Sequence, residues 1–295
     1  MHIPDLRSLW QQWRRDRRRT RKKLRKLAAA EVVVVSFSKS GRTWLNAMAS
    51  HYYHLKCGTP PDLLLNGGNL KALDSAVPSL FYTHGVELHG RTVETVSRVL
   101  PLLAGKKTIF LFRDPCDVAV SRYFQMTHRK EAIGRSDLPK GIDSSCLLDL
   151  DFMLHEIAGL PCIIRFMNAW AKLVADLSPV LRVEYERMAA HPRDVLAEII
   201  GFVDGKVDAA LVDRAVTFAS FGNLQALERT GFFRGDRFGG NPFDPNSLKV
   251  RRGKVGGYRD YFAPTELEAI DRFVAERLSP EFPYGREALA VAAAS

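Results

Sequence analysis

The apolar positions of the chain form short runs that each end in a polar turn. Val32 to Val35 are four consecutive valines, and Thr108–Phe112 is a second apolar run of similar length. Such short runs without alternation predict strands buried on both faces, as in a parallel sheet covered by helices. Residues 79–85 and the start of 180–188 predict two further short strands. We expect the first strand to end at Val35 or Ser36.

Segments whose apolar residues recur at helical spacing lie between and after these runs. The clearest case is Asp151–Leu177, in which Phe166, Ala169, Trp170 and Leu173 recur on one face, a stripe that we assign to the core. Further helices are expected over residues 194–203, 208–219 and 264–278, and directly after the predicted strands at residues 44 and 117. Strands that alternate with helices predict a single α/β domain, in which helices flank a parallel sheet.

Residues 222–248 show neither the short apolar runs typical of the strands nor the helical spacing of apolar residues. They contain five glycines and four phenylalanines without a regular pattern. A stretch of this length predicts either disorder or a functional lid.

Length and composition are compatible with one large core, whereas charge divides the chain. The 295 residues are 46% hydrophobic, enough for a single large domain. Residues 1–30 carry eleven Lys and Arg side chains against two Asp, while the rest of the chain is almost neutral. We therefore divide the chain into a basic amphipathic arm (1–30), one large folded domain (31–284) and a C-terminal tail (285–295).

The arm allows more than one interpretation. Leu6, Leu9, Trp10 and Trp13 recur at helical spacing beside the basic block, which is typical of a helix on an anionic membrane surface, here through residues 1–27. A solvated helix or tail without a partner is equally compatible. Nucleic-acid binding is not expected, because no recognisable module accompanies the charges.

The cysteines and the hydropathy bear on location. Cys57, Cys116, Cys146 and Cys162 show no C-x-x-C pair and no metal-ligand spacing with histidine, so reduced thiols and no metal site are expected. The chain has neither an apolar run of eighteen residues nor a signal-peptide core. These features predict a cytoplasmic protein, with peripheral attachment to the inner face of a membrane as the alternative.

The segment after the first strand has the composition of an anion site. A strand, a tight polar turn and a helix N-terminus place backbone N–H groups and the positive end of the helix dipole together, and a lysine adds a full charge. An ordinary strand-to-helix turn would have the same outline. The lysine precedes the glycine, so the loop is not a Walker A motif. Its residues are Ser38, Lys39, Ser40, Gly41, Arg42, Thr43 and Trp44.

The loop sequence SFSKSGRTWL resembles the phosphosulfate loop of sulfotransferases that use 3′-phosphoadenosine 5′-phosphosulfate (PAPS). Two more segments resemble motifs of this family in the same order. The first is RDPCDVAVS, in which Arg113 and Ser121 match the residues that bind the 3′-phosphate. The second is RRGKVGGYRDYF, in which Arg251, Arg252 and Gly253 match the segment that closes over the nucleotide.

Weaker matches nominate the remaining site residues. Tyr185 matches a tyrosine that contacts the adenine, and Phe221 loosely matches an aromatic residue that packs on the base. Thr83-His84 resembles part of a K-T-H motif whose histidine is the general base, although Tyr82 and Gly85 depart from it. A histidine at a strand end is more often a capping or core residue. Arg42 replaces a small residue of the loop, and would either add charge to the sulfate site or point to solvent.

The resemblance implies a PAPS-dependent sulfotransferase that needs no metal. His84 would take the proton of an acceptor hydroxyl or amine, and Lys39 would neutralise the departing phosphate. The acceptor, whether a small molecule, a glycan or a lipid, is not encoded in a pattern that we can interpret, and neither is the oligomeric state. Two other classes stay open: an ATP-dependent small-molecule kinase on a related phosphate-loop fold, and a non-catalytic, membrane-associated nucleotide-binding protein.

Overall fold

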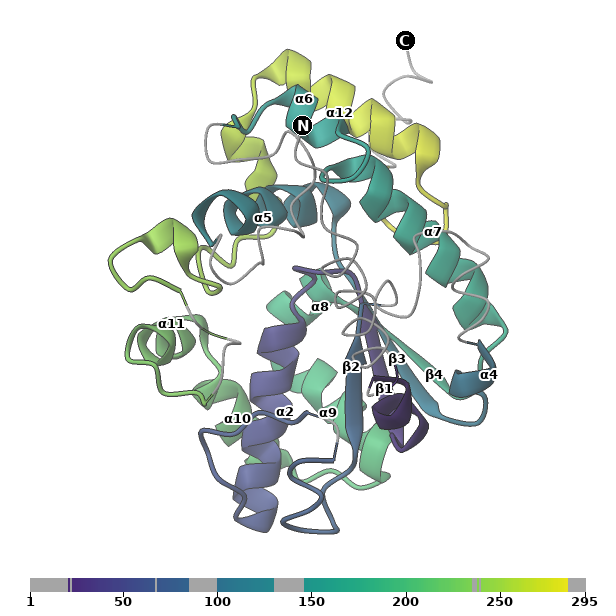
Figure 1. Ribbon diagram of the computed structural model, residues 1–295, viewed down its shortest axis with the longest axis vertical. Helices are drawn as coiled ribbons and strands as arrows, with labels where there is room; N and C mark the ends of the chain where they lie inside the picture. Colours follow the sequence, from purple (N-terminus) through teal and green to yellow (C-terminus); the bar gives the residue numbers. More distant parts are fainter. Residues whose placement is uncertain are drawn as a thin grey trace, which may run out of the picture.

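Four parallel strands form the centre of the protein. The computed structural model describes residues 21, 23–66, 68–84, 100–129, 146–234, 238 and 240–285. Within these residues the sheet has the order β2-β1-β3-β4 (Figure 1). The strands are β1 (Val32–Ser36), β2 (Leu80–Thr83), β3 (Lys107–Phe112) and β4 (Val180–Glu184). The predicted fold class, a single α/β domain with a parallel sheet between helices, is confirmed.

The register of the sheet aligns the carboxyl ends of the strands. Val35 of β1 lies opposite Thr83 on one side and Phe110 on the other, and Phe112 lies opposite Glu184. The residues that follow the strands therefore emerge at one edge of the sheet. In an open parallel sheet this edge is where ligands bind.

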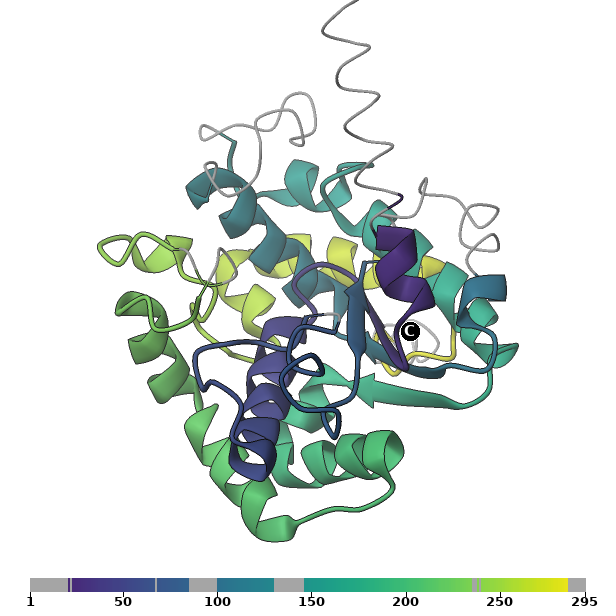
Figure 2. The same ribbon diagram turned by 60° about the horizontal axis from the view of Figure 1, so that its bottom comes forward.

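Helices cover both faces of the sheet, as Figures 1 and 2 show. Alternate strand residues belong to two different cores. Val33 and Val35 belong to a core with α5 (Pro115–His128), α6 (Leu150–Leu154), α7 (Leu160–Ala175) and α12 (Pro264–Arg277). Val32 and Val34 belong to a second core with α2 (Arg42–Cys57), α8 (Tyr185–Ala190), α9 (Pro192–Asp204) and α10 (Ala209–Phe218). Burial on both faces explains the unbroken apolar run from Val32 to Val35 in β1. The other elements are α4 (Leu100–Leu103), α11 (Phe221–Arg229), η4 (Pro245–Ser247) and η5 (Gly257–Tyr261).

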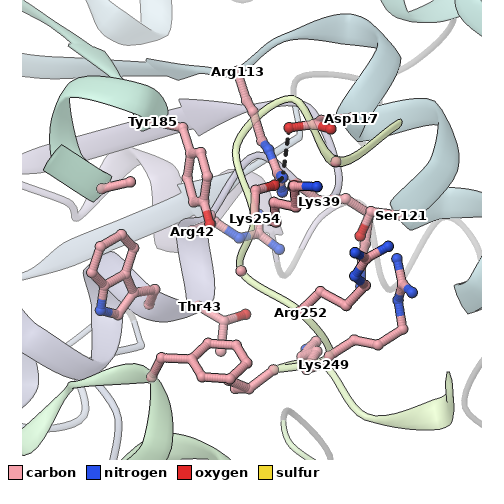
Figure 3. Close-up of a pocket in the computed structure, with 18 of the residues that line it drawn as sticks. Lys39, Arg42, Thr43, Arg113, Asp117, Ser121, Tyr185, Lys249, Arg252 and Lys254 are labelled. Carbon is pink, nitrogen blue, oxygen red and sulfur yellow. Dashed lines mark hydrogen bonds and ion pairs between the residues drawn. The ribbon is translucent and has the colours of Figure 1, made fainter. Parts of the chain in front are cut away.

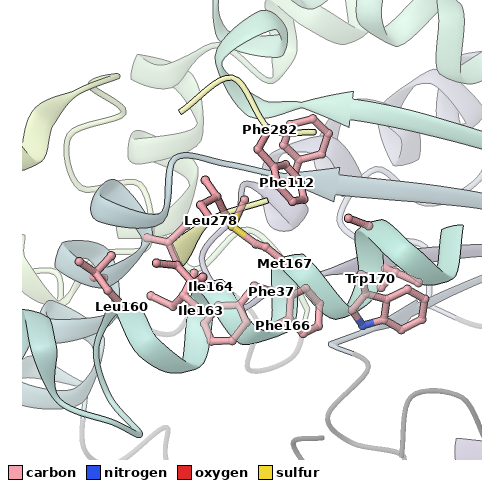
Figure 4. Packing of buried hydrophobic residues seen from close by; sticks show 14 of the residues in the cluster. Phe37, Phe112, Leu160, Ile163, Ile164, Phe166, Met167, Trp170, Leu278 and Phe282 are labelled. Carbon is pink, nitrogen blue, oxygen red and sulfur yellow. The ribbon is translucent and has the colours of Figure 1, made fainter. Parts of the chain in front are cut away.

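The predicted stripe of α7 lies in the core. Phe166, Ala169, Trp170 and Leu173 are all buried, and the indole of Trp170 is stacked 6.4 Å from the ring of Phe110. Figure 4 shows the α7 side chains beneath β3 and the C-terminal Phe282. The interpretation of this stripe as packing, and not as a ligand site, is confirmed.

The single helix expected over Asp151–Leu177 is in fact two. α6 ends at Leu154 and α7 begins at Leu160, with Gly159 between them. A Cβ atom at Gly159 would lie 2.2 Å from the carbonyl oxygen of Met153, so the chain can reverse so closely here only because this residue is glycine. Apolar spacing continues across the break, and so the pattern alone did not reveal it.

Disorder is the wrong prediction for the described part of 222–248. Residues 221–229 form helix α11, and the ring of Phe233 is stacked 4.5 Å from that of Phe238. The buried carboxylate of Glu228 accepts hydrogen bonds from the backbone N–H groups of Lys249 and Val250, at 2.8 and 2.9 Å. Glu228 thus ties α11 to the residues that follow this segment.

The described end of the predicted arm is part of the domain. Residues 23–28 are helical, and Leu27 is fully buried in the same core as α7, with Leu24 packed against it. Lys106 donates to the carbonyl oxygens of Ala28 and Ala30 at 2.9 and 2.7 Å. The packed domain thus begins before Glu31. Residues 1–20 of the arm, with its membrane-facing side, and residues 286–295 of the tail lie outside the described residues.

In the part of the chain that the structure describes, every helix is too short or too polar to cross a bilayer.

Substitution of Leu27 measures how far the arm contributes to the domain. Leu27 is 0% exposed, so Leu27→Ala should lower the free energy of unfolding by about 2–4 kcal/mol. The matched control is Leu73→Ala at a side chain that is 60% exposed, for which little change is expected. Urea unfolding followed by circular dichroism provides both values. Equal values for the two variants would show that residues 23–30 are not part of the cooperative unit.

Candidate active site

A cavity of about 360 Å³ opens at the carboxyl edge of the sheet. Each site residue nominated from the sequence contributes to its lining except Ser40, which is buried. Figure 3 shows Lys39, Arg42, Thr43, Arg113, Ser121, Tyr185 and Arg252 around this space. The nominated residues that line the cavity are Ser38, Lys39, Gly41, Arg42, Thr43, Trp44, His84, Arg113, Ser121, Tyr185, Phe221, Arg251, Arg252 and Gly253.

The loop between β1 and α2 has an unusual backbone. Lys39 is a non-glycine residue with a positive φ of 75°, and Gly41 has a φ of 91°. A Cβ atom at Gly41 would lie 2.4 Å from Cδ2 of Tyr185. Glycine is thus required both by the backbone angle and by the tyrosine ring against it. The loop turns directly into α2, which begins at Arg42, earlier than the expected residue 44.

Lys39 is held where a positive charge is unfavourable. Burial, together with the nearby cations Arg129, Arg113 and Arg251, lowers the pKa of its ammonium group from 10.5 to about 7, although the carboxylate of Glu228 opposes this. A cluster of cations that depress the ionisation of one another is stabilised by a bound anion. The electrostatics of the loop therefore fit an anionic ligand.

Arg113 lines the cavity and combines ring stacking with charged hydrogen-bond donors. Its guanidinium carbon lies 4.1 Å from the ring centroid of Tyr185, and Nη2 donates to Oδ2 of Asp117 at 3.1 Å. Its Nε is buried and has no hydrogen-bond partner among the described residues. A buried donor without a partner is costly, so this atom favours a ligand that can accept its hydrogen.

Asp117, near the start of α5, joins two of the motifs. The cap of α5 is Asp114, whose carboxylate accepts from the N–H of Cys116 at 2.7 Å. Asp117 instead accepts from Arg113 and from the backbone N–H groups of Gly256 and Tyr258, at 2.9 and 3.0 Å. One buried carboxylate thus ties the segment after Arg251 to the end of β3.

The basic segment 251–254 is held by its own set of contacts. The guanidinium of Arg251 lies 3.8 Å from the ring centroid of Phe124, and Nη1 donates to the hydroxyl of Tyr261 at 2.6 Å. Arg252 also donates to Tyr261, at 3.1 Å, and it pairs with Asp260. These contacts leave the two arginines at the rim of the cavity, where their charges face the space that Lys39 lines.

Aromatic side chains form a third wall. The indole of Trp44 lies edge-on to Tyr185, with centroids 5.9 Å apart, and its Nε1 donates to the carbonyl oxygen of Ala219 at 2.8 Å. Phe221 is 43% exposed and lies against Gly253, whose φ of 63° and close approach to the ring both require glycine. An apolar slot of this kind suits a flat heteroaromatic ring.

His84 is linked to the loop by Arg42. Its Nδ1 donates to the carbonyl oxygen of Ser36 at 3.0 Å, while Nη2 of Arg42 donates to Nε2 at 2.7 Å. Burial and the Arg42 charge hold the pKa of the imidazole well below 6.5, so the ring is neutral at pH 7. The sequence allowed Arg42 to add charge to the site or to point to solvent. In the structure it lines the cavity and contacts His84.

Several lining residues were missed by sequence reasoning. Asp117 and Gln125 flank Ser121 at four-residue spacing on α5, so helical periodicity from Ser121 could have found them. Lys249 and Lys254 flank the nominated Arg251–Gly253 segment, and charge alone was the available signal for them.

Comparison with known proteins identifies the family. The family described as "Sulfotransferase domain" matches residues 91–280 of this chain. Among curated relatives, Cytosolic sulfotransferase 5 of Arabidopsis thaliana is 25% identical over 279 residues, covering 84% of this chain and 79% of the relative. Flavonol 3-sulfotransferase of Flaveria bidentis is 24% identical, with coverages of 84% and 81%. The chain therefore belongs to the family of PAPS-dependent sulfotransferases, as its motifs predicted.

A solved structure agrees with this assignment at the level of the fold. Mouse sulfotransferase SULT7A1, crystallised as a complex with PAP, superposes with a TM-score of 0.57 at 20% identity. The match covers 92% of this chain and 94% of the mouse chain.

Replacement of Asp117 tests its role in holding the site together. Asp117→Asn keeps the shape but presents an amide N–H₂ to groups that are themselves donors. We expect the free energy of unfolding to fall by roughly 2–4 kcal/mol, because hydrogen bonds to a buried charge are lost. Asp260→Asn, in the same segment but at the surface, is the control and should have a much smaller effect. If the two variants unfold at the same urea concentration, Asp117 does not join the two motifs energetically.

Proposed function

We propose that the protein transfers the sulfuryl group of PAPS to the hydroxyl, or amine, of a small-molecule acceptor, with His84 as the general base. The observation that carries this proposal is that one cavity is lined by two groups of residues suited to anions: the Lys39 loop after β1, and Arg113 after β3 with Ser121 of α5. An ATP-dependent kinase needs only the first of these. A nucleotide with both a 5′-phosphosulfate and a 3′-phosphate would use both.

The 3′-phosphate would be bound by Arg113, Ser121 and Arg252. The buried Nε of Arg113 supplies a donor that the described residues leave without a partner, and Ser121 lines the same cavity. Arginine guanidinium groups suit phosphate because their donors form a planar fork. The adenine would lie in the slot formed by Trp44, Tyr185 and Phe221, where stacking requires no specific hydrogen bonds.

The phosphosulfate would lie on the loop of residues 38–43. Backbone N–H groups at the start of α2 and the ammonium of Lys39 are available for the 5′-phosphate and the bridging oxygen. Sulfuryl transfer, like phosphoryl transfer, depends mainly on in-line positioning and on charge stabilisation. The cations of the cavity supply that charge, and the proposal therefore includes no metal ion.

The reaction itself needs one proton acceptor and one cation. The acceptor oxygen forms a bond to sulfur as the bond from sulfur to the 5′-phosphate oxygen breaks. The electron pair of the broken bond stays on that oxygen, where Lys39 offsets its charge. The hydroxyl proton passes to Nε2 of His84, which the Nδ1–H bond to Ser36 keeps as the basic nitrogen.

The names of the relatives support two further proposals, on the class of acceptor and on the location of the protein in the cell. One relative is named for action on a flavonol, which favours a small-molecule hydroxyl over a glycan or lipid acceptor for this chain. Relatives that are named as cytosolic favour a cytoplasmic location. Attachment of residues 1–27 to an anionic membrane surface stays a prediction from sequence alone.

Nucleotide titration tests the donor. Adenosine 3′,5′-bisphosphate should bind at least about tenfold more tightly than 5′-AMP, because one charge-assisted phosphate contact is worth roughly 1.5–3 kcal/mol. Arg113→Ala should lose most of this difference, whereas Arg165→Ala, at an exposed arginine on α7, should retain it. Calorimetry gives the constants. Preference for ATP with Mg²⁺ would favour a kinase instead, and absence of nucleotide binding would favour the non-catalytic alternative.

Proton uptake when adenosine 3′,5′-bisphosphate binds tests the charge state of Lys39. Because burial lowers its pKa to about 7, Lys39 is mostly neutral at pH 8.5 in the ligand-free protein. A bound 5′-phosphate raises that pKa again, so binding at pH 8.5 should take up close to one proton, and at pH 6 should take up none at Lys39. Calorimetry in buffers of different ionisation enthalpy measures this number.

Two variants test whether Lys39 is the group that takes up the proton. Lys39→Met should abolish the uptake at pH 8.5, and Lys56→Met, at a lysine paired with Asp204 at 2.8 Å, should not. The same uptake in the wild type and in Lys39→Met would assign the proton to another group.

Removal of the base tests the mechanism. His84→Ala should reduce kcat by about 10²–10⁴-fold, the usual contribution of general-base catalysis. Transfer of radioactive sulfate from PAPS to a panel of phenols, alcohols and amines provides the assay, and the bisphosphate affinity should be nearly unchanged. Activity within threefold of wild type would show that His84 is not the base.

A further inference from the structure

The contact between Arg42 and His84 occupies the atom that the proposed mechanism needs. Arg42 is the first residue of α2, and His84 follows β2 directly. Nη2 of Arg42 lies 2.7 Å from Nε2 of His84, and Nδ1 of the same ring lies 3.0 Å from the carbonyl oxygen of Ser36. A carbonyl only accepts and a guanidinium only donates, so the ring has its proton on Nδ1 and its lone pair on Nε2.

A base in this arrangement is correctly oriented but unavailable. The lone pair of Nε2 already accepts a hydrogen from Arg42, so an acceptor hydroxyl cannot donate to it in the same place. The charges that face the ring also oppose its protonation. They are Arg42 from α2, Lys249 from the segment after η4, and Lys23 from the helical residues 23–28. His84 is therefore a base that is held neutral and whose Nε2 is occupied.

The same arginine is within the loop that would bind the donor. Arg42 lies between Gly41 and Thr43, both of which line the cavity with Lys39. Figure 3 shows its side chain extending from α2 into the pocket. A guanidinium forms a stronger hydrogen bond with a charged oxygen than with a neutral ring nitrogen. A sulfuryl group on the loop thus competes with His84 for Arg42.

We propose that Arg42 is a positioning residue that makes the base dependent on the donor. Without PAPS it holds His84 in the Nδ1–H tautomer and covers Nε2. When the phosphosulfate occupies the loop, the guanidinium turns to the sulfuryl oxygens and exposes Nε2 to the acceptor hydroxyl. This inference rests on the proposed sulfotransferase activity, to which it adds an order of events: the donor must bind before the base can act.

The experiment follows the imidazole of His84 by NMR on protein labelled with ¹⁵N-histidine. A His84→Gln spectrum assigns the signal. In the ligand-free protein, Arg42→Ala should raise the pKa of His84 by about one unit or more, and Arg42→Lys should restore part of the difference, because both the charge and the hydrogen bond contribute. Arg252→Ala removes an equal charge from the cavity rim without touching His84, and should shift this pKa by much less.

Addition of PAPS then tests whether the bound donor moves Arg42 away from His84. In the wild type, saturating PAPS should move the Nε2 signal to that of a ring without the Arg42 hydrogen bond, close to its position in Arg42→Ala with PAPS. Adenosine 3′,5′-bisphosphate, which lacks the sulfuryl group, should leave the Arg42 contact in place. Comparison with Arg42→Ala under the same ligand removes the direct effect of the ligand charge.

The possible outcomes separate the two proposals. An unchanged His84 pKa in Arg42→Ala, or an unchanged Nε2 signal when calorimetry shows PAPS bound, would overturn the role of Arg42 and leave the sulfotransferase assignment intact. An equal response to the bisphosphate and to PAPS would also overturn it, because the sulfuryl group would then not be what moves Arg42. If PAPS does not bind at all, the proposed function fails and this inference fails with it.

Discussion

The parallel alignment of four strands is the constraint on which the site depends. Since β1 to β4 all run in the same direction and in register, the residues after them meet at one edge of the sheet. The loop with Lys39 follows β1, and His84, Arg113 and Tyr185 directly follow β2, β3 and β4. Residues almost 150 positions apart in the chain thereby line a single cavity. An antiparallel strand at any of these places would carry its residue to the opposite edge.

Electrostatics give this edge its function. Cations are concentrated where water is scarce, and the depressed pKa of Lys39 reflects the cost of that arrangement. The carboxylate of Asp117 compensates only part of it, through Arg113. Buried charges without full compensation destabilise a fold, and they are retained where a ligand supplies the missing charge. An anionic nucleotide with two phosphate positions is the ligand that best matches the cluster.

Local patterns in the sequence predicted much of this account, and contacts between distant segments explain what they missed. The valine run, the Lys39 loop and Arg113 could be found because each signal lies within about ten residues. The link from Asp117 to Gly256 and the contact of Arg42 with His84 join segments 139 and 42 residues apart, and no periodicity encodes them. The break at Gly159 was missed because the apolar spacing continues through it. Leu27 was placed in the arm because its basic neighbours hid its role in the core.

The most direct test of the central claim is a crystal structure of the complex with adenosine 3′,5′-bisphosphate. The account predicts the 5′-phosphate on residues 38–43, the 3′-phosphate within hydrogen-bonding distance of Arg113 and Ser121, and the adenine between Tyr185 and Phe221. A bisphosphate bound elsewhere, or one whose 3′-phosphate points to solvent while Arg113 keeps its present contacts, would contradict the account.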